Sequence, residues 1–158
     1  IMYTRLMLAV IGAVLAGSIA LAGDTDNSAK EQKSCTGSNY EMRVCLISLL
    51  ERRDKELKST FDDLVFRLRS IEAFFSNSDV VAIPDPKAVL ELRQVQKLWG
   101  QFLGAECDWE SSLHGSGSIA PLVSLGCRIG LIEARNRQLG YLRDGYKNQG
   151  YGEDLDRR

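Results

Sequence analysis

Apolar residues recur every three or four positions over three long stretches of this chain, and this spacing is the feature that most restricts its fold. In an α-helix the spacing places the apolar side chains along one face. It predicts helices over residues 40–75, over residues 87–110, and from residue 118 or 121 to residue 143. Ser118 suits the cap of the third helix and Pro121 its first turn. No segment of useful length alternates apolar and polar residues as a strand does.

Three amphipathic helices of this length must bury their apolar faces against one another. The sequence therefore predicts an all-α fold, a small antiparallel helical bundle of three long helices, with room for a short N-terminal helix near residues 35–45. Pro84 and Pro86 disfavour helix at the residues before them and so separate the first two helices. Asp54 falls on the apolar face predicted for the first helix, which comprises Ile47, Leu50, Leu57, Phe61, Leu64, Leu68, Ile71 and Phe75.

Residues 1–22 have the features of a signal peptide for export. Arg5 supplies a short positive region, residues 6–21 are uncharged and mainly apolar, and small residues at Ala20 and Ala22 suit signal peptidase, so cleavage is expected after Ala22. An uncleaved membrane anchor is the alternative, because the apolar stretch approaches the roughly 18 residues that span a bilayer. The small residues and the polar segment after them favour cleavage. Asp24 stands where a lipoprotein would need cysteine.

Four cysteines follow the predicted signal, and an even number in an exported chain indicates disulfides. Three pairings are possible. We favour Cys35 with Cys45 and Cys107 with Cys127, because each pair is close in sequence and encloses turn residues. Zinc binding is the competing interpretation, but the chain has no Cys-x-x-Cys pair and a single histidine.

The composition excludes several classes of function. The chain has 20 Lys and Arg against 21 Asp and Glu, which argues against a nucleic-acid partner and against binding to an anionic membrane surface. No nucleophile lies beside an orienting base, so neither catalysis nor a cofactor is expected. The predicted organisation is a signal peptide (residues 1–22), a flexible segment (23–34), one helical domain (35–143) and a loose polar tail (144–158), in the periplasm or secreted.

Several motifs are spread along the predicted helical domain. Two cysteines ten residues apart precede an Asp-x-x-Leu motif at residues 54–57, and a Gln-x-x-Trp motif at residues 96–99 precedes Cys107. A Gly/Ser loop at residues 115–118, a further cysteine and an Arg-x-x-x-Leu motif at residues 135–139 follow. Together these motifs, over residues 35–142, resemble the LprI-like lysozyme-inhibitor family of small exported helical domains. The resemblance implies a helical domain that binds and blocks lysozyme.

The chain departs from the family pattern at four positions. Lys58 and Phe61 stand where the family has Asn and Tyr, and Leu103-Gly104 replaces an Arg-Asp pair. Phe61 keeps the aromatic volume, so the departures bear on the partner that is bound rather than on the fold. The alternative function is therefore a periplasmic structural or interaction protein, without catalysis, whose partner is not lysozyme.

The candidate contact lies around the Gly/Ser loop. If Cys107 and Cys127 are joined, the segment from Trp109 to Gly126 forms a closed, protruding loop. Lysozymes are commonly basic with a carboxylate-lined cleft. Acidic residues beside this loop would therefore attract a lysozyme and speed its association with the chain. The expected binding residues are Glu106, Asp108, Glu110, His114 and Ser116.

Four residues are expected to be structural. Asp54 either pairs with Arg135 near the bundle interior or reaches solvent if the first helix rotates slightly. Trp99 is expected in the core, and Gln96 is expected to bond a loop carbonyl.

Export and disulfide formation are tested by one measurement. We expect intact-mass analysis of the natural product to show a chain that starts at Gly23, and the mass gain on reduction to match two disulfides. An unprocessed chain with four free thiols would contradict the prediction.

Overall fold

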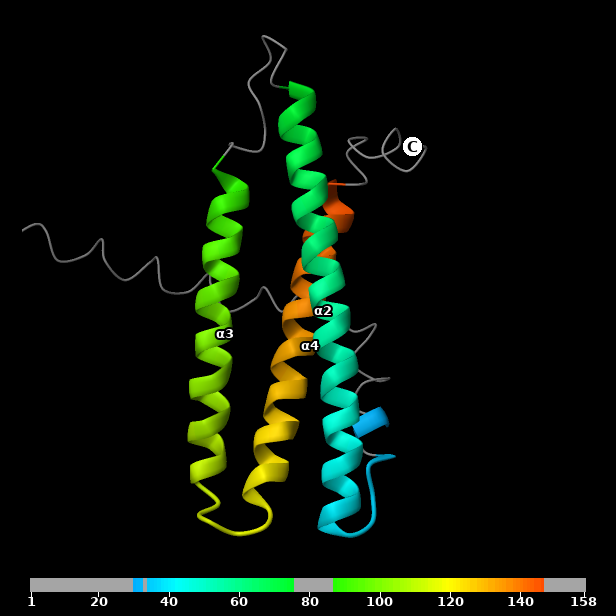
Figure 1. Cartoon of the computed structure of the whole chain (residues 1–158), viewed down its shortest axis with the longest axis vertical. Helices are drawn as coiled ribbons and strands as arrows, with labels where there is room; N and C mark the ends of the chain where they lie inside the picture. Colours follow the sequence, from blue (N-terminus) through cyan, green and yellow to red (C-terminus); the bar gives the residue numbers. More distant parts are fainter. Residues whose placement is uncertain (1–29, 33, 76–86, 147–158) are drawn as a thin grey trace, which may run out of the picture.

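The computed structural model describes residues 30–32, 34–75 and 87–146. It contains α2 (Asn39–Phe75), α3 (Ala88–Ser112) and α4 (Ala120–Tyr146), and no strand occurs within those residues (Figure 1). The predicted all-α bundle is confirmed. The largest difference in helix bounds is at the end of α4, which continues to Tyr146 because that side chain packs against the hydrophobic core.

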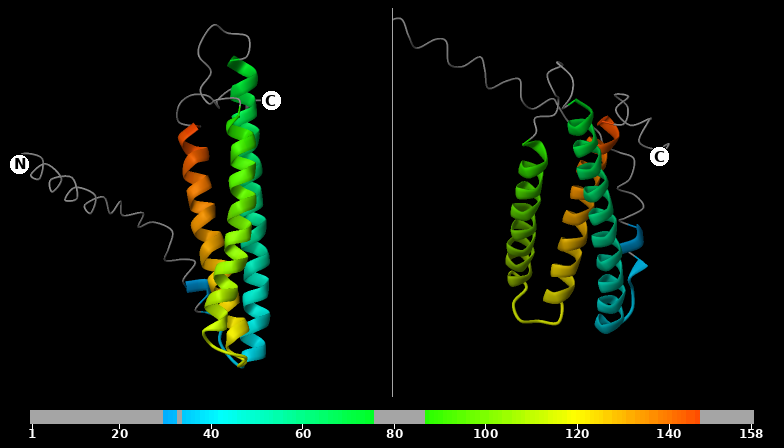
Figure 2. Two further views of the ribbon diagram at one scale, coloured as in Figure 1. Left: turned by 90° about the vertical axis from the view of Figure 1, so that its left-hand side faces the viewer. Right: turned by 45° about the horizontal axis from the view of Figure 1, so that its top comes forward.

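The three helices run up, down and up, with α4 between α2 and α3 (Figures 1 and 2). Helix α3 is antiparallel to both others, whereas α2 and α4 run in the same direction. The most extensive contact joins α2 to α4, α3 packs mainly on α4, and α2 and α3 touch little. Helix α4 is therefore the central element, and α3 is attached to one side of it.

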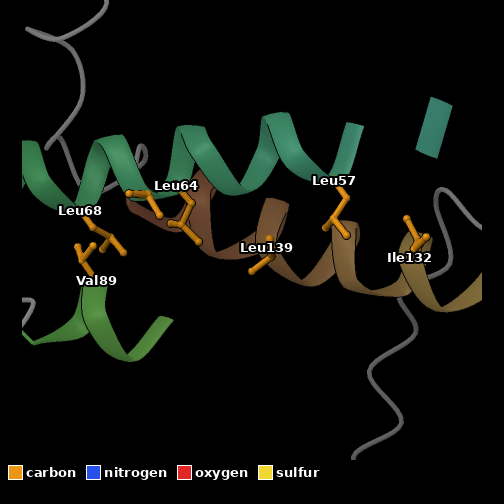
Figure 3. Close-up of a cluster of buried hydrophobic side chains, with 7 residues drawn as sticks. Leu57, Leu64, Leu68, Val89, Ile132 and Leu139 are labelled. Atoms are coloured by element: carbon orange, nitrogen blue, oxygen red, sulfur yellow. The ribbon is translucent and has the colours of Figure 1, made fainter. Parts of the chain in front are cut away.

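The main core cluster is built from all three helices (Figure 3). Most of it lies between α2 and α4, and Val89 adds α3 near its first turn. Half-buried Leu92, Trp99 and Leu103 extend the contact along α3. The buried members are Leu57, Leu64, Val65, Leu68, Val89, Ile132 and Leu139.

The predicted apolar face of α2 is wrong in its first turns. Ile47 is 38% exposed, and Leu46 and Leu49 are buried instead against Ile129. The cause is the helical period, because steps of 3.6 residues back from Leu57 lead to residues 50 and 46 rather than 47. The same register turns Arg53 toward α4 and leaves the neighbouring Asp54 exposed.

Both predicted disulfides are present, Cys35 with Cys45 and Cys107 with Cys127, each with 5.6 Å between its Cα atoms. The first attaches the segment before α2 to the side of that helix. The second joins the end of α3 to the start of α4. Bridges that close loops of this size stabilise a fold by about 2–4 kcal/mol.

The start of α2 carries a reciprocal cap. The backbone N–H of Ser38 donates to the Glu41 carboxylate (2.8 Å), and the backbone N–H of Glu41 donates to Ser38 Oγ (3.3 Å). The bond from the Ser38 backbone N–H lowers the pKa of Glu41, and so does Ser38 Oγ, which donates to the same carboxylate (2.8 Å). Gly37 precedes the cap at a φ of 115°, where a Cβ would also lie 2.6 Å from the Glu41 carboxylate, so this tight entry requires glycine.

The segment before Cys35 contains helical residues. Residues 30–32 and 34, within the segment predicted to be flexible, are helical. Glu31 pairs with Arg52 and Arg53 of α2. Gln32 Nε2 lies so close to Gly126 of α4 that a Cβ added to this glycine would be only 2.8 Å from it. These contacts and the adjacent disulfide fix the segment against α2 and α4.

The predicted signal peptide, the Pro84 to Pro86 connection and residues 147–158 of the predicted tail lie outside the described residues. Within residues 30–32, 34–75 and 87–146, none of the helices combines the length and apolar character needed to span a bilayer.

The central position of α4 predicts a large difference between two of its leucines. Leu139 is 0% exposed and Leu142 is 42% exposed. We expect Leu139→Ala to lower the free energy of unfolding by about 3 kcal/mol through the cavity it leaves, and Leu142→Ala by less than about 1 kcal/mol. Urea unfolding followed by circular dichroism measures both. Equal losses would mean that α4 is not the centre of the core.

Candidate partner-binding end of the bundle

The end of α3, the start of α4 and the start of α2 meet at one end of the bundle, here called the turn end (Figure 1). The connection between α3 and α4 is only the seven residues 113–119, because both helices continue into the segment predicted as a protruding loop. Consecutive backbone bonds build it, from the N–H of Leu113, His114 and Gly115 to the carbonyls three residues earlier. The prediction of a loop over residues 109–126 is therefore wrong, and the residues predicted to bind a partner lie on a helix end and a tight turn.

Two hydrogen bonds hold this turn against the helices. Asn39 Nδ2 at the start of α2 donates to Ser118 Oγ (2.8 Å), and Ser111 Oγ donates to the Ala120 carbonyl (2.9 Å). Gly115 takes a φ of 64°, which favours glycine. With the Cys107–Cys127 bridge one turn away, the turn end is a fixed surface. Ser118, expected to cap α4, instead links its turn to α2.

The five predicted binding residues share this end but not one face. Glu106 and Glu110 are one helical turn apart and lie on the same side of α3. Asp108 points to the other side, where it accepts a bond from Arg128 of α4 at 3.0 Å. His114 and Ser116 are exposed in the turn.

The turn end carries an uncompensated negative charge. From Leu98 to Cys127 the sequence has no Lys or Arg, although it has Glu106, Asp108 and Glu110. Arg128 neutralises Asp108, whereas neither glutamate takes part in an ion pair within the described part of the chain. Both glutamates are partly exposed, so a protein with a positive surface would meet two carboxylates here.

Asp54 faces the same Arg128 from α2. It is exposed and forms no pair with Arg135, so of the two predicted arrangements the solvent-facing one is found. Partial desolvation raises the pKa of the Asp54 carboxyl above its ordinary value, and the charge of Arg128 opposes this by a smaller amount. Arg128 thus lies between carboxylates of α2 and α3 while bonded only to the latter.

Arg135 is a buried cation in the contact between α3 and α4. It is 8% exposed, its Nε donates to Gln96 Oε1 (3.0 Å), and its Nη1 donates to Gln138 Oε1 (2.6 Å). The guanidinium lies over the half-buried Trp99 ring, 5.9 Å from its centre. Gln96 therefore bonds Arg135 rather than the predicted loop carbonyl. Burial without a carboxylate partner lowers the pKa of Arg135.

An ion cluster between α2 and α4 was not predicted from the sequence. Arg53 donates to Glu133 of α4 (2.8 Å) and to Glu56 (3.0 Å), and it also pairs with Glu31. The pKa of Arg53 is raised, since these carboxylates outweigh the opposing effect of its burial. Only the three-residue spacing of Arg53 and Glu56 was visible in the sequence. The other partners lie 22 and 80 residues away.

No group of three metal-binding side chains occurs within residues 30–32, 34–75 and 87–146. A family model described as lysozyme inhibitor LprI matches residues 29–139, which include both disulfides and most of the bundle. The chain belongs to the LprI family. No curated protein and no solved structure matched it. The LprI motifs at Gln96, Trp99 and Arg135 thus meet in one contact between α3 and α4, whereas the motif at Asp54 lies apart from it.

The raised pKa of Asp54 gives a pH-dependent prediction. A carboxyl whose pKa is higher in the folded than in the unfolded chain destabilises the fold when ionised, so the penalty is present near pH 7 and disappears as the pH falls below the ordinary value of about 4. We therefore expect Asp54→Asn to raise the free energy of unfolding at pH 7 but not at pH 3. Urea unfolding at both pH values measures this, with Glu51→Gln, an exposed site on the same helix, as the control. A loss of stability at pH 7 would mean that attraction to Arg128 dominates.

Proposed function

We propose that this LprI-family protein is an exported binding protein that inhibits lysozyme in the periplasm or outside the cell. Membership of a family described as lysozyme inhibitors supports a protein partner of this kind. Two disulfides suit an oxidising compartment, where they persist. On this proposal the protein acts by occupying its partner and catalyses no reaction.

The observation that carries the proposal is the uncompensated charge at the turn end. Glu106 and Glu110 have no ion pair within the described residues, and the surrounding sequence from Leu98 to Cys127 supplies no Lys or Arg. Acidic groups on a fixed surface accelerate encounter with a basic protein and favour it over acidic competitors. The proposed contact comprises Glu106, Asp108, Glu110, His114 and Ser116.

A second candidate function follows from one departure from the family pattern. Half-buried Leu103 and Gly104 stand on α3 where an Arg-Asp pair is expected, so two charged groups next to the proposed contact are missing. The change is explained if the chain is an envelope interaction protein that binds a partner other than lysozyme. An assay of lysozyme inhibition distinguishes the two functions, because only the first predicts inhibition.

A turbidity assay tests the proposal. We expect the purified mature protein at micromolar excess to slow the clearing of cell-wall suspensions by lysozyme, and the triple variant Asp108→Ala, Glu110→Ala, His114→Ala to inhibit at least about tenfold less because it loses charge and contact at the turn end. No inhibition by the unmodified protein would leave the second candidate.

The control for the triple variant is Glu51→Ala combined with Asp62→Ala. It also removes two carboxylates, but from α2, where both are exposed. Inhibition equal to that of the unmodified chain is expected, with unchanged helix content in both variants. If the triple variant stays fully potent, the turn end is not the contact.

A further inference from the structure

Helix α3 carries two apolar faces. One face, which includes Val89 and Cys107, is buried against the rest of the bundle. A second set of large apolar side chains is 48% to 65% exposed. We call this set the outer stripe; it consists of Val95, Leu98, Phe102, Trp109 and Leu113.

The members of the outer stripe form one continuous line. Their spacing follows the three-four pattern from residue 95 to residue 113, with Ala105 filling the remaining step. At 100° per residue, Phe102 and Trp109 lie about 140–160° around the helix from Cys107, on nearly the opposite side. The line is about 27 Å long at 1.5 Å per residue and ends at the turn.

The arrangement of the helices leaves this stripe open. Helix α3 packs on α4, and α2 lies beyond α4, so the outer side of α3 faces away from both (Figures 1 and 2). Contiguous exposed apolar surface of this extent marks interaction sites in soluble proteins. Isolated exposed apolar residues are common, but five that follow the helical spacing form one continuous apolar face.

The borders of the outer stripe indicate the charge of the partner. Glu106 and Glu110, the two carboxylates without an ion pair in the described chain, follow one edge of its lower half. Gln94 and Gln101 follow the other edge. Two copies of the chain joined through this stripe would bring together carboxylates from a segment, residues 98–127, that contains no Lys or Arg, whereas a basic partner would neutralise them.

We propose that the outer stripe of α3, with Glu106 and Glu110 along its edge, is the surface on which a folded, positively charged protein docks. The identity of that protein as lysozyme rests on the proposed function. The stripe supplies the desolvated centre of the interface, with Phe102 and Trp109 as its aromatic anchors. The glutamates supply the charge that speeds encounter, and the turn end forms the edge of the contact.

The test uses the mature, disulfide-bonded chain and a basic c-type lysozyme in a surface-binding assay. Phe102→Lys places a charge in the centre of the stripe, and we expect it to weaken binding at least about tenfold, mainly through faster dissociation. Glu106→Gln with Glu110→Gln should mainly slow association and reduce its dependence on salt.

Leu90→Lys is the matched control. Leu90 is 69% exposed on the same helix but lies outside the stripe, and the variant gains the same charge. We expect its affinity to stay within about twofold of the unmodified chain. Thermal unfolding establishes that both lysine variants are folded.

Three results would overturn the inference in distinguishable ways. Binding by the unmodified chain that Phe102→Lys leaves unchanged would place the contact elsewhere and leave the proposed function standing. Absence of any binding by the unmodified chain would remove both. A dimer in light scattering that Phe102→Lys converts to a monomer would assign the stripe to a second copy.

Discussion

Burial of α4 between its two neighbours is the constraint on which the rest of this structure depends. Its fully buried Ile129, Ile132 and Leu139 pack against α2, and its opposite side receives α3. The polar side chains of a helix that is enclosed on two sides need hydrogen-bond partners on the neighbouring helices, and Arg135 and Glu133 both have them. Arg135 is bonded by two glutamines and covered by Trp99, and Glu133 is bonded by Arg53. The polar contacts thus fix the rotation of α4 about its axis, whereas the apolar contacts supply most of the stabilisation.

Local patterns in the sequence were sufficient for the elements and their crosslinks. The three-four spacing located all three helices to within a few residues, and proximity along the chain identified both disulfides. The Ser38-x-x-Glu41 cap was also readable from spacing, although it was not part of the prediction. These features involve residues close in sequence, for which the physical consequence of a pattern is largely independent of the tertiary fold.

Features that depend on how the helices rotate against one another were not predictable. Leu46 and Leu49 are buried instead of the predicted Ile47, which corresponds to a small rotation of α2 about its axis. The same rotation places Arg53 rather than Asp54 at the contact with α4. The pairing of Gln96 with Arg135 spans 39 residues and needs the crossing of α3 and α4 to be known. The acidic residues at the turn end were identified by their position beside the Gly/Ser loop, but helical geometry divided them between two faces. The exposed apolar line on α3 could be recognised only from the packing of the helices.

The two disulfides also make the bundle unequal along its length. Both crosslinks, the Ser38 cap and the bond from Asn39 to Ser118 belong to the turn end. In the described part of the opposite end, around Leu68 and Val89, side-chain packing and the ion pair of Arg143 with Asp63 (3.8 Å) join α4 to α2, without a disulfide. Partial opening of a protein begins where the fewest constraints must be broken. Thermal fluctuations are therefore expected to fray this molecule from the far end first, so that the proposed binding surface keeps its shape in partly opened states.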